Sequence, residues 1–263
     1  MPAMPRPTAV GRLAPEVNPG ARASGAHATV RLRPRTPVDL RRQAERAIAA
    51  AEAGRSRLPP EVLALEGYSS PTVRHFLNNL CRFAAANYLE VGTWKGSTLM
   101  SAAYGNRGRF SAVDDFSHHV QSKREGREAR AELGRVRRRF RRSCRTTFHD
   151  SDCWDPALLR RLPRDVNVYF YDGRHTFEDQ YRAFTHFEPV LAARYVAVVD
   201  DWNRAYVREA TRAALSDLRH EVRWERELFT RGWFRQHLTG QWSGPHWFNG
   251  LLVAVLRKPR AAR

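Results

Sequence analysis

Short apolar runs alternate with amphipathic segments along most of the chain, and this alternation is the main structural signal. Six segments are predicted to be strands, and four of them are short and apolar, as strands buried on both faces should be. The predicted strands occupy residues 88–91, 110–113, 167–171, 195–199, 221–229 and 251–256. Because helical segments separate them, the pattern predicts an α/β fold with a doubly wound parallel sheet.

Two helices are predicted before the first strand. Residues 38–54 contain good helix formers and end in Gly54, which suits the position just after a helix C-cap. A second helix should follow Pro71. Its apolar residues fall at spacings of three and four, as on the buried face of a packed helix, and they are Val73, Phe76, Leu77 and Leu80.

The composition of the N-terminus differs from that of the rest. Residues 1–37 are rich in Pro, Ala, Gly and Arg and contain one acidic residue, Glu16, so we predict a disordered tail that is dispensable for chemistry. The predicted parts are the tail 1–37, a helical cap 38–87, a catalytic core 88–258 and a short basic end 259–263.

Length and composition limit the possible classes of protein. The 263 residues suit one α/β domain, and no apolar run approaches the ~20 residues of a membrane span. The three cysteines have no paired spacing, which favours a reducing cytoplasm. The net charge of +18 comes almost entirely from arginine and indicates a compositional bias. Its densest run, residues 123–145, is interpreted as a solvated helix face in preference to a patch that binds phosphate or an acidic substrate.

A glycine-containing loop follows the first core strand. Gly92 and Gly96 lie where a strand ends and a helix begins, an arrangement that lets a ligand approach bare backbone and helix amides. Asp114 ends the next strand, where its carboxylate could bind the ribose hydroxyls of a nucleoside. The Glu-x-Gly-x-x-x-Gly spacing disfavours a dinucleotide site.

The segments EVGTWKGST and AVDDF resemble the class I S-adenosylmethionine (SAM) methyltransferases, in particular the family typified by macrocin O-methyltransferase. The resemblance runs from about residue 67 to 258 and implies a Rossmann-like, seven-stranded sheet with helices on both faces. It implies SAM as cofactor, with Asp114 at the ribose. The implied methionine-side contacts are Glu90, Gly92, Thr93, Gly96 and Ser97, and the implied adenine-side contacts are Phe148, His149, Asp150 and Ser151.

Aspartates follow two more predicted strands. Asp172 follows the predicted strand 167–171, and Asp200 and Asp201 follow the predicted strand 195–199. These ends should be neighbours, so three carboxylates would repel one another unless a hard divalent cation such as Mg²⁺ lies between them. The resembled family holds its metal with aspartates at these positions. It also places a Lys or His base where this chain has His175, which implies that His175 accepts the acceptor's hydroxyl proton.

The acceptor is the least determined part of the prediction. The resemblance implies O-methylation of a small molecule, such as a sugar or phenol of a natural product, while Arg174 would favour an acidic or phosphorylated acceptor. The aromatic residues between the last two strands are equally compatible with an acceptor pocket and with a core, and they are Trp233, Phe234, Trp242, Trp247 and Phe248.

The same sequence bears on other functions. A methyltransferase acting on nucleic acid is disfavoured, because Tyr-Asp-Gly-Arg-His stands where the amino-methylating enzymes carry Asn- or Asp-Pro-Pro-aromatic. A binding protein would have no need of carboxylates and a histidine at two strand ends. A different reaction at the same site stays open, as does a homo-oligomeric assembly.

Overall fold

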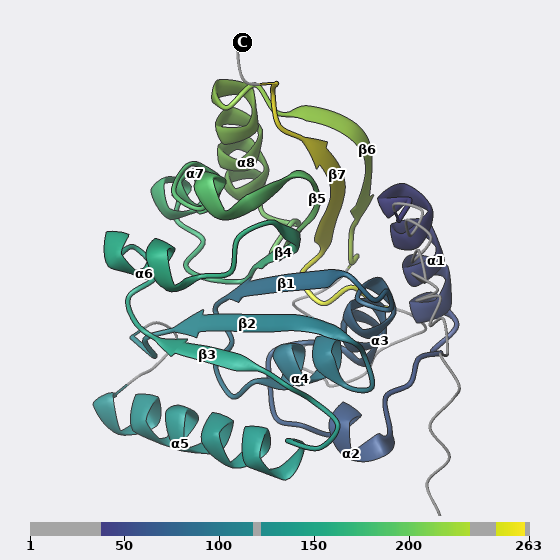
Figure 1. Ribbon diagram of the computed structural model, residues 1–263, viewed down its shortest axis with the longest axis vertical. Coiled ribbons are helices and arrows are strands. Elements are labelled where there is room, and N and C mark those ends of the chain that lie inside the picture. The colour runs from purple at the N-terminus through teal and green to yellow at the C-terminus, as the bar shows by residue number, and fades with distance from the viewer. Residues whose placement is uncertain (1–37, 118–121, 232–245, 261–263) are drawn as a thin grey trace, which may run out of the picture. The chain divides into compact units, whose positions relative to one another are not determined.

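A seven-stranded mixed sheet forms the centre of the computed structural model, which describes residues 38–117, 122–231 and 246–260 (Figure 1). The predicted tail 1–37 lies outside the described residues. The strands are β1 (Ala86–Val91), β2 (Gly108–Asp114), β3 (Thr147–Asp150), β4 (Val166–Tyr171), β5 (Leu191–Val199), β6 (Glu221–Leu228) and β7 (Leu251–Arg257). All six predicted strands are confirmed, and β3 adds a short seventh.

The strands lie in the order β3-β2-β1-β4-β5-β7-β6. Neighbours from β3 to β5 pair in parallel, whereas β7 pairs antiparallel with both β5 and β6. The predicted doubly wound sheet is confirmed, and β7 is the one described strand that runs antiparallel to the rest of the sheet, between β5 and β6. The carboxyl ends of β1, β2, β4 and β5 still meet at one edge of the sheet, as a doubly wound fold requires.

Helices cover both faces of the sheet (Figure 1). The helices are α1 (Leu40–Glu52), α2 (Pro60–Leu63), α3 (Pro71–Leu80), α4 (Ser97–Ala103), α5 (Lys123–Arg139), α6 (Pro156–Arg161), α7 (Phe177–Thr185) and α8 (Ala205–Asp217), with a 3₁₀ turn at Glu188–Val190. Side chains of α1 to α4 share one hydrophobic cluster with one face of the sheet. Side chains of α6, α7 and α8 share a second cluster with the other face.

Successive residues of each central strand contribute to opposite clusters. In β1, Tyr88 belongs to the first cluster and Leu89 to the second, and both are fully buried. Phe170 and Tyr171 divide in the same way in β4. Because both faces are covered, most positions of the central strands are apolar, which explains why these strands appear as short apolar runs in the sequence.

The helices before β1 form as their sequences predict. The side chain of Asp39 accepts a hydrogen bond from the Arg42 amide at the start of α1, and Gly54 has a φ of 62° just after its end. Helix α3 begins at Pro71 and buries the whole predicted apolar stripe. Both predicted helices are confirmed.

Within the described ranges, no helix combines the length and the apolar character needed to cross a membrane. The cysteines Cys81, Cys144 and Cys153 form no disulfide, as their spacing predicted.

Candidate active site

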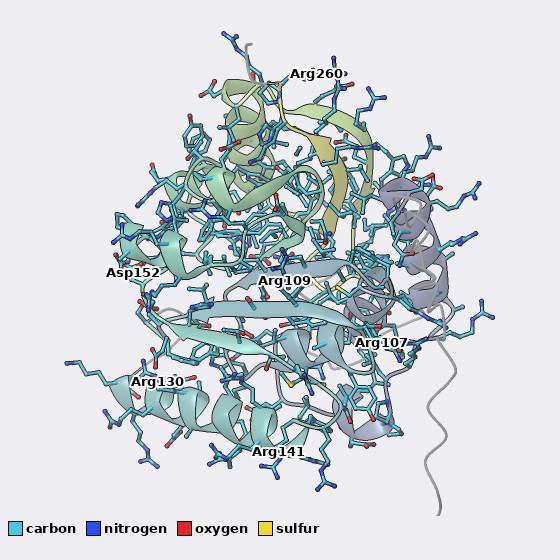
Figure 2. All side chains as sticks on the ribbon, viewed as in Figure 1. Arg107, Arg109, Arg130, Arg141, Asp152 and Arg260 are labelled. Carbon is cyan, nitrogen blue, oxygen red and sulfur yellow. The ribbon has the colours of Figure 1, made fainter. Side chains whose placement is uncertain are left out.

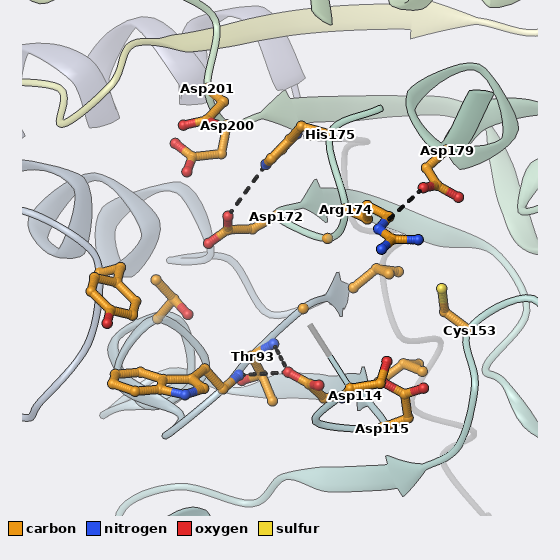
Figure 3. Close-up of a pocket in the computed structure, with 18 of the residues that line it drawn as sticks. Thr93, Asp114, Asp115, Cys153, Asp172, Arg174, His175, Asp179, Asp200 and Asp201 are labelled. Carbon is orange, nitrogen blue, oxygen red and sulfur yellow. Dashed lines mark hydrogen bonds and ion pairs between the residues drawn. The ribbon is translucent and has the colours of Figure 1, made fainter. Parts of the chain in front are cut away.

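A cavity of about 790 Å³ lies at the carboxyl ends of β1, β2, β4 and β5 (Figure 3). Its lining comes from segments that are far apart in the sequence, from Gly67 before α3 to Phe248 before β7. The lining includes Gly92, Thr93, Ser97, Asp114, Asp172, His175, Asp200 and Asp201 from the predicted site. A cavity at this edge is where an open α/β sheet binds its ligands.

The glycines of the loop after β1 have packing reasons as well as a place near the cavity. Gly92 has a φ of 84°, and a Cβ there would lie 2.0 Å from the carbonyl oxygen of Asp172. Gly96 has a φ of 87°, and a Cβ there would lie 2.5 Å from the Leu133 side chain on α5. Both positions therefore need glycine for backbone conformation and close packing. Gly92 lines the cavity, whereas Gly96 does not.

Asp114 ties the glycine loop to the end of β2 (Figure 3). Its Oδ2 accepts hydrogen bonds from the backbone amides of Thr93 at 2.9 Å and Trp94 at 2.7 Å, and its Oδ1 accepts one from the Phe116 amide at 2.7 Å. A carboxylate offers about four acceptor positions, so roughly one remains for a ligand. The neighbouring Asp115 also lines the cavity, and its Oδ1 bonds only within the following turn, to Ser117.

Glu90 does not line the cavity. Its side chain is fully buried on β1, where it accepts hydrogen bonds from the hydroxyls of Tyr88 and, at 2.8 Å, Thr98. Burial raises the pKa of Glu90 to about 7. Glu90 therefore supports the cavity wall indirectly, through its hydrogen bond to Thr98, which lines the cavity.

Two strand ends bring together a group of three side chains. Asp172, His175 and Asp200 each offer one ligand atom, and these atoms all lie within 4.8 Å of one another. His175 Nε2 lies 3.7 Å from Asp172 Oδ1 (Figure 3). The side chains of His175 and Asp172 are 7% and 26% exposed, so water screens them little.

The charged form of these two carboxyl groups is unfavourable in the folded protein. Burial is the main cause that raises the pKa of Asp172 and of Asp200 well above the usual range, and the charge of Asp201 raises both further. A cation between them would remove this cost. Two carboxylates and an imidazole form a donor set that suits a divalent metal, and the carboxylates favour a hard one such as Mg²⁺.

Asp201 enters the cavity wall in a different way. Its φ of 57° turns the chain after β5, so that Asp200 and Asp201 both line the cavity. Both carboxylate oxygens are already engaged: Oδ1 accepts from Asn249 at 2.7 Å, and Oδ2 pairs with Arg204 at 2.8 Å. Among the described residues, the close group of possible ligands thus contains His175 in place of Asp201.

The residues implied for adenine lie outside the cavity. His149 lines a separate hollow with Arg145 and Arg161, Asp150 pairs with Arg130 at 2.7 Å, and Ser151 accepts a hydrogen bond from Arg161 at 3.1 Å. The parallel register pairs Asp114 with Asp150, so the chain reaches the cavity only after this point. The next three residues, Asp152, Cys153 and Trp154, do line the cavity.

Aromatic residues form part of the cavity wall. Tyr68 stacks on Trp94 with ring centroids 4.6 Å apart, and both line the cavity together with Phe248. Trp247 instead packs in the core against Phe76. No local pattern in the sequence marks Tyr68 as a cavity residue, whereas Trp154 lies three residues after Ser151, the last of the residues that the resemblance implies for adenine. Trp233, Phe234 and Trp242 lie outside the described residues.

The arginines near the cavity are mostly balanced by aspartates. Arg204 pairs with Asp201, and Arg174 lies 3.9 Å from Asp179 (Figure 3). Arg182 stacks over the Trp154 ring at 4.3 Å. Figure 3 shows Arg174 well separated from Asp200 and Asp201, so its charge is not directed at the close group of Asp172, His175 and Asp200.

The Arg-rich run forms the amphipathic helix α5 and the turn that follows it. Four residues of the helix are buried, namely Gly126, Ala129, Leu133 and Val136, while most of its arginines are exposed. Figure 2 shows the Arg141 side chain, just past the helix, projecting away from the sheet. This arrangement is the solvated helix face that the sequence predicts.

Comparisons with known proteins agree with this architecture. Residues 89–202 match the model of a family described as a methyltransferase domain. No curated protein sequence matches the chain. Among solved structures, an O-methyltransferase from Bacillus cereus in complex with S-adenosylhomocysteine (SAH) has 18% sequence identity and a TM-score of 0.51, and the match covers 84% of this chain and 92% of that one.

Two further matches have lower TM-scores. An SAH-bound methyltransferase from Podospora anserina has 12% identity and a TM-score of 0.47, over 87% of this chain and 100% of that one. An rRNA methylase from Streptococcus thermophilus has 10% identity and a TM-score of 0.44, over 71% of this chain and 94% of that one. The sheet order and the match to the Bacillus cereus structure show that the chain has the fold of the class I methyltransferases, and its residues 89–202 match a methyltransferase domain.

Proposed function

We propose that the protein transfers a methyl group from SAM to a hydroxyl group of a small-molecule acceptor, such as a sugar or phenol of a natural product, and that it uses Mg²⁺. One observation carries the proposal. Asp172, His175 and Asp200 form a close, weakly screened group in the same cavity as the glycine loop and Asp114. Methyl donor, metal and acceptor would thus meet in one cavity.

The residues around β1, β2 and β3 would hold SAM. Asp114 keeps about one acceptor position for one ribose hydroxyl. Oδ2 of Asp115, which accepts no hydrogen bond from another described residue, is the candidate acceptor for the second ribose hydroxyl. Gly92, Thr93 and Ser97 would lie along the methionine part, and Asp152 to Trp154 would take the adenine role first expected of His149 to Ser151. The aspartates of the lining suit a cofactor that carries a positive sulfonium.

Asp172 and Asp200 would hold the metal. When bound, Mg²⁺ would supply a positive charge that lowers the pKa of a hydroxyl group placed beside it. Asp201, predicted as a third ligand, would instead complete the acidic wall, because Asn249 and Arg204 already occupy its oxygens. This assigns the direct contact to Asp200 of the aspartate pair.

His175 would act as the general base. In the reaction the acceptor oxygen bonds to the methyl carbon, the bond from sulfur to that carbon breaks, and its electron pair stays on sulfur to give SAH. The hydroxyl proton passes to Nε2 of His175, which lies at the cavity surface beside Asp172. Tyr68, Trp94 and Phe248 would provide apolar contact for the acceptor.

The direct test is to incubate the full chain with labelled SAM and Mg²⁺ in the presence of glycosides, phenols, phosphorylated analogues of both, and RNA. Transfer of label to a hydroxyl oxygen of a glycoside or phenol, located by product mass and fragmentation, would support the proposal. Label on a base of RNA would show methylation of nucleic acid and would contradict the proposal.

The cytoplasmic location expected from the cysteines stays a prediction.

A further inference from the structure

A buried glutamine lies directly behind His175. Gln180 is on α7, its side chain is fully buried, and no part of it lines the cavity. Its Oε1 lies 3.2 Å from Nδ1 of His175, and its Nε2 donates to Oγ1 of Thr211 at 3.0 Å. Thr211, on α8, is also fully buried. The amide thus joins the histidine to a second helix on the side away from Asp172.

The pairing determines where the imidazole carries its proton. With the Gln180 amide in this orientation, its oxygen accepts and its nitrogen donates to Thr211, so Nδ1 of His175 is the donor to the amide. A neutral imidazole has one N–H, and Nε2 then has a lone pair. That lone pair faces the cavity, 3.7 Å from Oδ1 of Asp172.

The ring is also fixed in its orientation. Tyr171 meets the imidazole edge-on, with ring centroids 5.9 Å apart and planes at 89°. The Tyr171 hydroxyl donates to the backbone carbonyl of Arg174 at 2.8 Å, which anchors the segment that carries His175. Tyr171 therefore holds the plane of the ring, while Gln180 is the described side chain that bonds to its inner nitrogen.

Packing alone does not account for a glutamine at this position. A fully buried amide costs free energy unless its donors and acceptor are paired, and an apolar side chain of similar length would avoid that cost. Here the amide reaches one polar group on each side, and one of them is the proposed base.

We propose that Gln180 is a positioning residue that keeps His175 in the tautomer with the proton on Nδ1, so that Nε2 is free to accept the acceptor's proton. This inference rests on the proposed function for its catalytic meaning, but the tautomer itself is a property of the free protein. At metal-ligating histidines, removing such a partner typically costs about 10–100-fold in metal affinity or activity, and we expect a loss of the same order for a histidine that acts as a base.

The test compares Gln180→Met with Tyr181→Phe. Tyr181 is the next residue of α7, and its hydroxyl also links α7 to α8, through a 2.7 Å bond to Asp217 at the surface. Both variants remove one hydrogen bond between the same two helices, but only Gln180→Met removes the partner of His175. A merely structural role predicts similar behaviour for both.

The readout is ¹⁵N NMR of the His175 ring in the full chain, with a chelator present and at pH 8, where ordinary imidazole is neutral. His175→Ala identifies the signals by their absence. We expect protonation at Nδ1 in the wild type and in Tyr181→Phe, and a shift of the proton toward Nε2 in Gln180→Met. Turnover should fall about 10–100-fold in Gln180→Met, with the SAM dissociation constant unchanged.

Two results would overturn the inference: a wild-type ring protonated at Nε2, or the same tautomer in Gln180→Met as in the wild type. Failure of the proposed function would appear differently. In that case the tautomer would shift as expected in Gln180→Met, while the wild type would methylate none of the acceptors.

Discussion

Two regions of the molecule each contain seven like charges, and they use them in opposite ways. The cavity is lined by seven aspartates with three arginines. The stretch from residue 134 to 146, at the end of α5 and in the turn after it, contains seven arginines and no acidic residue. Most of these arginines are exposed, and the exposed ones remain hydrated. In the cavity, burial raises the pKa of Asp172 and Asp200.

The comparison shows that charge density alone does not mark a site. At the surface, water and salt screen like charges, so the repulsion between neighbouring arginines costs little free energy. In the cavity the same repulsion is stored in the fold, and it is relieved only by a proton or a bound cation.

His175→Ala should lower turnover about 10²–10⁴-fold, the usual contribution of a positioned general base. Binding of metal and of SAM should persist, because the two carboxylates and the glycine loop remain. Turnover should recover in part at higher pH as the acceptor ionises unaided. Steady-state kinetics and isothermal calorimetry on one preparation would check this. Loss of metal binding in the same variant would instead make His175 a ligand.

Asp114→Ala should weaken SAM binding at least about tenfold, since a hydrogen bond to a charged group contributes about 1.5–3 kcal/mol. The variant also frees the amides of Thr93 and Trp94, which order the loop. Asp115→Ala should weaken SAM binding less, because it removes one proposed ribose contact but leaves Asp114 bonded to the amides of Thr93 and Trp94. Unchanged calorimetric affinity in Asp114→Ala would contradict the ribose assignment.

Asp200→Asn should stabilise the metal-free protein at neutral pH, by on the order of 1–3 kcal/mol. The folded state keeps protons on Asp172 and Asp200 at a pH where the unfolded chain has lost them. Stability from this source is therefore complete below the ordinary pKa of aspartate, about 3.9, and is lost as pH rises through the raised folded pKa. Urea unfolding with a chelator should show a gain at pH 8 and none near pH 4. A gain of equal size at both pH values would contradict the repulsion.

Replacing Arg138, Arg141 and Arg142 with Gln should change neither turnover nor unfolding free energy beyond about 0.5 kcal/mol per site, because all three are exposed. Kinetics with a neutral and a phosphorylated acceptor would check both properties. A tenfold rise in KM confined to the phosphorylated acceptor would show that the run is a binding patch and that the comparison is wrong.

The sequence predicts the fold well because both faces of the sheet are covered. Strands such as 195–199 must then be continuously apolar, and that signal is local. The placement of site residues at strand ends follows from the same topology. Pairing of β4 with β5 brings Asp172 and Asp200 together although they are far apart in the sequence.

Other features of the site depend on contacts that no local pattern contains. The engagement of Asp201 needs its left-handed conformation and a bond to Asn249, 48 residues away in the sequence. The displacement of His149 from the cavity depends on the register between β2 and β3. Gln180 is an ordinary helical residue until α7 packs against α8 and places Thr211 beside it.

The central claim is that Asp172 and Asp200 hold a divalent cation that the reaction needs. The most direct measurement is methyl transfer by chelator-treated protein as Mg²⁺ is added back, in the wild type, Asp172→Asn and Asp200→Asn. The wild type should recover turnover with saturation, and both variants should stay at least about 10³-fold slower, in line with the several kcal/mol that a metal contributes. SAM binding should persist in all three proteins. Full-rate methylation by metal-free wild type would show that the carboxylates are structural and would contradict the account.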